Sequence, residues 1–143
     1  MSFVSLWSSD LTTKTALPSL YDVKLASTSN GFALVGHENA STVQQFSSFK
    51  LDGTSVCGPL DLPASFVPAS LVATPKGYLV ISSGAVKAQE ILANCTLGVS
   101  FDIDPGPASD VHAASGPDGY GVVWQNTTTE VPMRRLFGSR YCD

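Results

Sequence analysis

The sequence predicts an all-β protein built from repeated units of four antiparallel strands. A tight turn ending in glycine, then an aromatic residue, then a run of strand-forming apolar residues, is typical of a hairpin leading into a buried strand. Three segments have this order: 28–35, 74–81 and 116–123. Their anchor glycines Gly31, Gly77 and Gly119 lie 46 and 42 residues apart. That period fits one four-stranded unit for each copy.

A second match far from these turns supports the same repeat. Segments 51–57 and 136–142 share Leu, Gly and Cys at the same positions. The repeat is therefore longer than one turn. Alternating, β-branched segments also exclude a helical solenoid of similar period.

The first full unit is expected to contain four strands joined by short turns. The Asp52-Gly53 pair between two of them is a strong hairpin signal. Two earlier strands are predicted at 3–11 and 15–20. Those of the first unit are predicted at 23–27, 32–36, 43–51 and 55–62.

The second unit repeats this plan, and segment 104–107, with its two prolines, is predicted to break the chain before the third. The expected strands are 69–73, 78–82, 86–95 and 99–103, then one from 111, 120–124 and 131–137. We therefore treat 1–143 as a single β-repeat domain. Its units are about 1–20 (partial), 21–66, 67–109 and 110–143.

Composition limits the function classes. The chain has 143 residues, of which 43% are hydrophobic and 14% charged, so it is expected to fold around a core. With a net charge of −4 and only 8 Lys and Arg residues, it is not expected to bind nucleic acid or an anionic membrane. No apolar run approaches the roughly 20 residues needed to span a bilayer.

Three cysteines, Cys57, Cys95 and Cys142, permit at most one internal disulfide bond. Their spacing fits no zinc site, and neither a metal nor a cofactor is expected. Cys57 and Cys142 occupy the same repeat position in different units. They should therefore lie too far apart to bond within one chain.

Three of the four asparagines lie in glycosylation sequons: Asn39, Asn94 and Asn126. This enrichment favours an extracellular or cell-surface protein. Accidental sequons in a chain rich in Ser and Thr are the alternative. The first seven residues lack the basic residues and long apolar core of a secretion signal, so the chain is either cytoplasmic or a mature or excised piece.

No residue set predicts catalysis. His37 and His112 fall at unrelated repeat positions, and no Gly-x-Ser-x-Gly elbow occurs. Asp102 and Asp104 lie two apart, as in a glycosidase or calcium site, but a solvated strand end before Pro105 is the simpler interpretation. We therefore name no catalytic and no metal-binding residue.

These repeats resemble β-propeller blades over nearly the whole chain. The Trp-Asp pair of WD40 blades, the double glycine of kelch blades and the box of sialidase-like blades are missing, so no blade subfamily is indicated. A compact β-sandwich or barrel is the alternative fold. The resemblance implies a ring of blades, and propellers serve as enzymes, lectins, receptors and scaffolds.

In an up-and-down blade, the turns between the second and third strands open on one face. Here that face would gather five residues as a predicted ligand site: His37, Glu38, Asn39, Trp124 and Gln125. An exposed Trp beside amides suits a sugar ring, whose apolar face stacks while its hydroxyls form hydrogen bonds. The alternative for Trp124 is packing in the core.

The sequence thus favours a non-enzymatic binding or assembly module, either lectin-like or a subunit of an extracellular surface structure. A glycosidase-like hydrolase on the same fold is the alternative. The expected partners are glycans, further copies of the chain or another blade-bearing chain. Partner chains are expected because about three units are too few to close a ring. Within the chain, the N-terminal strand is a candidate for the strand missing after Phe137.

Overall fold

The computed structural model describes residues 5–7, 14–17, 20–38, 41–116, 119–126 and 136–137. Over these residues the protein is all-β, as predicted, with antiparallel strands joined by turns. The described part contains no helix that is long and apolar enough to cross a membrane.

The first full unit is a four-stranded antiparallel sheet in the order β3-β4-β5-β6, which confirms the predicted plan. Its strands are β3 (Tyr21–Thr28), β4 (Gly31–His37), β5 (Gln44–Lys50) and β6 (Ser55–Asp61). Gly31 sits where β4 passes very close to β5. A Cβ atom at Gly31 would lie 2.2 Å from the Phe49 carbonyl oxygen, so only glycine allows this approach.

The rest of the chain forms one six-stranded antiparallel sheet in the order β12-β11-β10-β9-β8-β7. Its strands are β7 (Pro68–Thr74), β8 (Gly77–Ser82), β9 (Gly84–Leu92), β10 (Leu97–Gly116), β11 (Gly119–Asn126) and β12 (Leu136–Phe137). The second and third predicted units therefore share a sheet.

The predicted break at 104–107 is wrong, because β10 runs straight through it. The first part of β10 pairs with β9, and the part from Ala108 onward pairs with β11. Register shifts flank Asp104 on both sides, and such irregularities are where a strand accommodates prolines, which have no N–H to donate. The chain bends at this point without leaving the sheet.

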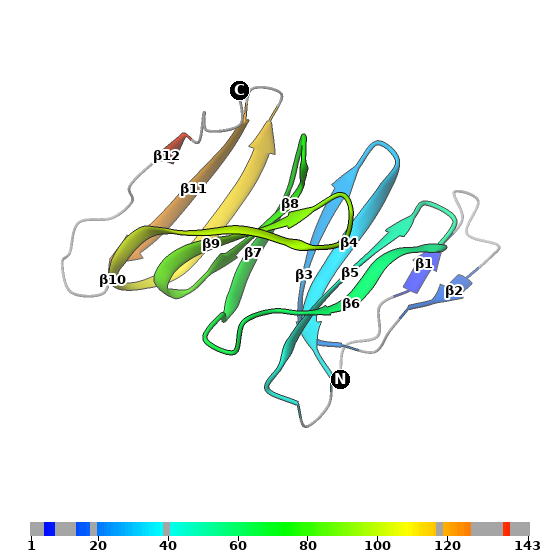
Figure 1. Ribbon diagram of the computed structural model, residues 1–143, viewed down its shortest axis with the longest axis horizontal. Helices are drawn as coiled ribbons and strands as arrows, with labels where there is room; N and C mark the ends of the chain where they lie inside the picture. The colour runs from blue at the N-terminus through cyan, green and yellow to red at the C-terminus, as the bar shows by residue number, and fades with distance from the viewer. Residues whose placement is uncertain are drawn as a thin grey trace.

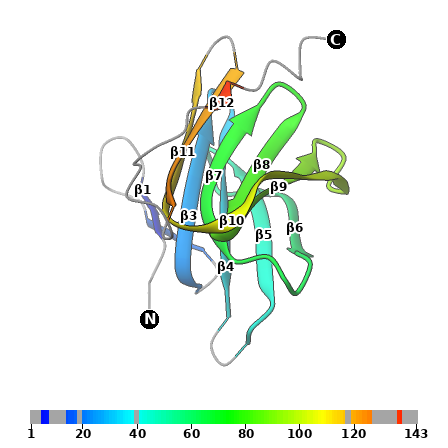
Figure 2. The ribbon, with the colours of Figure 1, turned by 90° about the vertical axis from the view of Figure 1, so that its left-hand side faces the viewer.

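This sheet curls until its second half meets its first strand. Ser70 on β7 accepts a hydrogen bond from the Ala113 N–H of β10 at 3.0 Å, and its hydroxyl donates to the Ala113 carbonyl at 3.4 Å. Figure 1 shows the curled sheet beside the first sheet, and Figure 2 views the curled sheet from its own side. The sheet thus has the form of a half-barrel.

Three layers pack face to face: the first sheet, strands β7–β9, and the second half of β10 with β11. Strand β3 contacts β7, and β7 contacts β10, so the innermost strands lie side by side. On β8, Val80 packs toward the first sheet, and Leu79 and Ile81 pack toward β11. This arrangement fits propeller-like blades, and the curled sheet fits the barrel alternative equally.

The N-terminal strands form a small sheet of their own. Strand β1 (Ser5–Trp7) pairs with β2 (Lys14–Ala16), and β12 pairs with β11. Figure 1 shows β1 and β12 at opposite ends of the molecule. The described part of β1 therefore does not supply the strand expected beyond Phe137.

Candidate functional site

Trp124 packs in the core, as the alternative interpretation of this residue predicted, and not in an exposed ligand site. This side chain is only 3% exposed and packs in the core of the curled sheet with Val111 and Val122. Its Nε1–H donates a hydrogen bond to Asp104 Oδ2 at 3.0 Å. The inward face of β11 carries Tyr120, Val122 and Trp124 in alternation, which places the indole ring inside. Trp124 therefore has no free ring face for a sugar.

The other predicted ligand residues are not brought together. The His37 ring stacks on Tyr21 with ring centroids 5.6 Å apart, and its Nδ1 lies 3.1 Å from the Glu38 carbonyl oxygen. Gln125 is exposed near the end of β11, on the far side of the second unit from β4. Asn39 lies outside the described residues.

The two aspartates considered for a glycosidase or calcium site have separate roles. Asp102 lies 3.6 Å from the ammonium group of Lys87, whereas Asp104 accepts hydrogen bonds from Trp124 and from the Gly106 N–H. A register shift lies between them, so the expected shared face is not formed. Over the described ranges, no three His, Cys, Asp or Glu side chains gather as a metal site would require.

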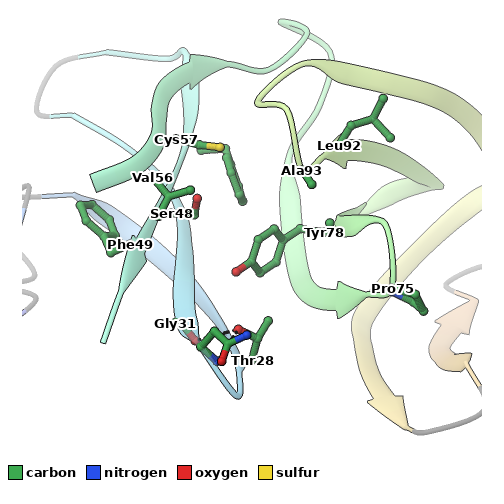
Figure 3. A pocket seen from close by; sticks show the side chains of 13 residues that line it. Thr28, Gly31, Ser48, Phe49, Val56, Cys57, Pro75, Tyr78, Leu92 and Ala93 are labelled. Atoms are coloured by element: carbon green, nitrogen blue, oxygen red, sulfur yellow. Dashed lines mark hydrogen bonds between the residues drawn. The ribbon is translucent and has the colours of Figure 1, made fainter. Parts of the chain in front are cut away.

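A cleft of about 370 Å³ lies instead between the first and second units, at the opposite end of the sheets from His37. The β3–β4 and β7–β8 turns border it, together with β5, β6 and the β9–β10 turn. Its lining residues are Thr28, Asn30, Gly31, Phe46, Ser48, Phe49, Val56, Cys57, Pro75, Gly77, Tyr78, Leu92 and Ala93 (Figure 3).

Two small residues of the cleft lining, Ser48 and Cys57, belong to a cross-strand row of small side chains in the first sheet. Ala26, Ala33, Ser48 and Cys57 are paired in register across β3, β4, β5 and β6. This row faces the second unit, which presents the ring of Tyr78. Small residues opposite a single large one leave space that the backbone alone would not.

Tyr78 is the main polar and aromatic group of the cleft. Its ring lies 5.3 Å from that of Phe46 in a tilted arrangement. Burial raises the pKa of the Tyr78 phenol, and a hydrogen bond with the Thr28 side chain opposes this only in part. The hydroxyl is therefore protonated near neutral pH, and its oxygen can also accept a hydrogen bond.

A disulfide bond ties the two walls of the cleft together. Cys57 on β6 is bonded to Cys95 in the β9–β10 turn, with Cα atoms 5.4 Å apart. That turn is also held to the β7–β8 turn, because the Ala93 N–H donates to the Lys76 carbonyl at 3.0 Å. The prediction that Cys57 does not bond to Cys142 is confirmed, since Cys57 is already paired.

The cleft is uncharged. Of its lining side chains only the Tyr78 phenol titrates, and none carries a charge at neutral pH. Aromatic and aliphatic surfaces from Tyr78, Val56 and Leu92 alternate with the polar groups of Ser48 and Asn30. Such a lining suits a neutral ligand with both an apolar face and hydroxyl groups.

One sequon borders this site. Asn94 is exposed in the β9–β10 turn, next to Ala93 of the cleft wall, and the Thr96 hydroxyl donates to its Oδ1 at 2.6 Å. Asn126 ends β11, and Asn39 lies outside the described residues. Glycosylation at all three stays a prediction.

Comparison with known proteins assigns no relative. No family model matches the sequence, and no curated protein matches it. The function of the site therefore follows from its own residues.

The sequence predictions missed Ser48 and used Tyr78 only as the aromatic residue that follows a turn. The available signal was the pair Ser47-Ser48 between two phenylalanines of β5, which places one small residue on each face of the strand.

Proposed function

We propose that this protein is a non-enzymatic binding module with lectin-like carbohydrate recognition, and that its binding site is the cleft between the first and second units. The observation that carries the proposal is the uncharged lining, which combines the Tyr78 ring with hydroxyl and amide groups. A sugar ring offers the matching chemistry, an apolar face and a rim of hydroxyls.

The size of the cleft restricts the ligand. About 370 Å³ is near the lower end of the range for small-molecule sites. This volume favours a small saccharide or the terminal residue of a longer glycan.

The Cys57–Cys95 bond supports an oxidising location, because disulfides persist mainly outside the cytosol. We infer an extracellular or cell-surface protein. Leu25 on the innermost strand β3 is exposed, which supports packing against a further unit from another copy or another blade-bearing chain. In this proposal the cleft binds the ligand, and the outermost layers of the molecule contact the partner chains.

A glycan array tests the binding proposal. Val56 and Val99 are both exposed, and only Val56 lines the cleft, so Val56→Asp and Val99→Asp form a matched pair. We expect the wild type to bind neutral glycans and Val56→Asp to lose at least about tenfold in affinity, because an unpaired carboxylate would occupy the cleft mouth. Val99→Asp should bind as the wild type does.

A silent array, or equal binding by Val56→Asp, would refute carbohydrate binding at this cleft. Release of free sugar from a bound glycan would instead support the hydrolase alternative. Light scattering of the purified chain tests assembly, because a monomer of 15.0 kDa at micromolar concentration contradicts packing between copies.

A further inference from the structure

Ser48 presents a buried hydroxyl to the cleft without a partner. The residue is 4% exposed and lines the cleft from β5 (Figure 3). Among the residues that the structure describes, its side chain neither donates nor accepts a hydrogen bond. Buried hydroxyls nearly always have a partner, and the Ser48 hydroxyl borders the cleft, where a bound molecule can supply one.

The other polar groups of the cleft differ from Ser48. Thr28 accepts a hydrogen bond from the Asn30 N–H and donates to the Gly31 carbonyl, and its side chain also bonds Tyr78. The Asn30 side chain is exposed at the rim, where water can solvate it. Ser48 is thus the deepest polar group of the lining whose hydrogen bonds are left open.

We propose that the Ser48 hydroxyl determines the selectivity of the cleft, by pairing with a hydroxyl group on a neutral ring-shaped ligand. This inference rests on the proposed function and names what the site requires of its ligand. A hydroxyl fits because Ser48 can donate and accept, and the Tyr78 phenol oxygen across the cleft can accept a further hydrogen bond. An anionic or cationic ligand would find no opposite charge among the lining side chains.

A packing role for Ser48 makes a different prediction. Ser48 lines the cleft and has to be small to leave it open, and alanine meets that need as well as serine. If size alone matters, Ser48→Ala changes nothing in ligand choice. If the hydroxyl recognises the ligand, Ser48→Ala removes the preference and keeps the cleft.

Ser47 provides a matched control next to Ser48 in the same strand. It is 7% exposed and also lacks a side-chain hydrogen bond among the described residues. It points to the opposite face of the sheet, beside Leu34, away from the cleft. Ser47→Ala therefore reproduces the chemical change without touching the lining.

The test is a titration of the isotope-labelled chain, followed by NMR, with phenol and toluene, which differ by one hydroxyl group. Methyl hexopyranosides serve as the sugar probe. We expect the wild type to prefer phenol to toluene by at least about tenfold, because a site with an unpaired buried polar group rejects the analogue that cannot pair with it. Ser48→Ala should bring this ratio close to unity, and Ser47→Ala should leave it unchanged. Thermal unfolding should show Ser48→Ala folded and at least as stable as the wild type.

Each outcome decides between the two proposals. A Ser48-dependent preference for phenol without any binding of pyranosides supports the role of Ser48 and refutes carbohydrate recognition. Pyranoside binding that Ser48→Ala leaves unchanged supports carbohydrate recognition and refutes the role of Ser48. Equal affinity of the wild type for phenol and toluene, or no binding of any probe, overturns the role assigned to Ser48.

Discussion

The two faces of the second unit are packed in different ways, although one strand serves both. Strand β8 presents Tyr78 and Val80 to the first unit and Leu79 and Ile81 to the third. The third unit answers with Tyr120, Val122 and Trp124, and the interface is filled. The first unit answers with Ala33, Val35 and Phe46 in the packed part of this interface, and a cleft remains beside Ser48 and Cys57. Side-chain volume, and not the course of the backbone, decides where a site opens.

The two interfaces also differ in what holds them together. The second interface is continuous, because β10 runs through both units and Ser70 bonds back to Ala113. The first interface joins two separate sheets, and the Cys57–Cys95 bond is its covalent link. The interface with the cleft should thus depend on the disulfide bond, and the filled interface on its large side chains.

Removing the largest side chain of the filled interface should have the greatest effect. Trp124→Ala deletes a buried indole and removes one of the hydrogen-bond donors to Asp104, so we expect a loss of about 3–5 kcal/mol in the free energy of unfolding. Trp124→Phe, which retains much of the volume, should cost clearly less. Urea denaturation measures both. A loss below about 1 kcal/mol for Trp124→Ala would show that this interface is not filled as described.

Removing the disulfide bond should weaken the interface that contains the cleft. Its cysteines are 38 residues apart, and the chain-entropy relation for a loop of that length gives about 4 kcal/mol. We expect the double variant Cys57→Ala/Cys95→Ala to lose up to that amount in urea denaturation. Cys142→Ser is the control and should retain the Cys57–Cys95 bond in peptide mapping. A Cys57–Cys142 bond in the wild type would contradict the pairing.

Two glycines allow the shared strand and the third unit to be tested separately. Gly77 begins the shared strand β8, and Gly121 lies on β11 of the third unit. A Cβ atom at Gly77 would lie 2.1 Å from the Ile91 carbonyl oxygen, and its φ of +146° disfavours other residues. Gly77→Ala should therefore cost about 2–4 kcal/mol. At Gly121 on β11 no atom lies within 4 Å of such a Cβ, so Gly121→Ala should be neutral or stabilise by up to about 1 kcal/mol. Equal effects in thermal unfolding would contradict this contrast.

The strands of the first unit were predictable because glycine turns fix its hairpins. Segments 32–36, 43–51 and 55–62 match β4, β5 and β6 closely. The passage through Asp104 was not predictable, since prolines in a sequence indicate a break and the bulges that accommodate them have no signature. The course of the chain through Asp104 decides whether units two and three form separate blades or one curled sheet.

The cleft was harder to foresee than the strands. Ser48 of its lining belongs to a small row with Ala26 and Ala33, and their alignment requires the registers of β3, β4 and β5 together. Trp124 was named in the predicted ligand site with core packing as the alternative, and the alternation of Tyr120, Val122 and Trp124 along one buried face agrees with the alternative. A repeat locates turns reliably, but the depth of a side chain depends on what the neighbouring unit places opposite it.

Tyr78 gives the smallest and most specific test, because it is the large residue of the interface with the cleft. Burial raises the pKa of its phenol, so the folded state holds this proton more tightly than the unfolded state does. The contribution of this burial to stability is fully present below the unfolded pKa of about 10 and is lost as the pH rises through the higher folded value.

Tyr78→Phe should cost about 0.5–1.5 kcal/mol near neutral pH through the lost hydrogen bond with Thr28. The stability of this variant should fall less than that of the wild type above about pH 10. Urea denaturation at several pH values measures this, and a constant difference between Tyr78→Phe and the wild type through the alkaline range would show that the phenol is not buried against the first unit.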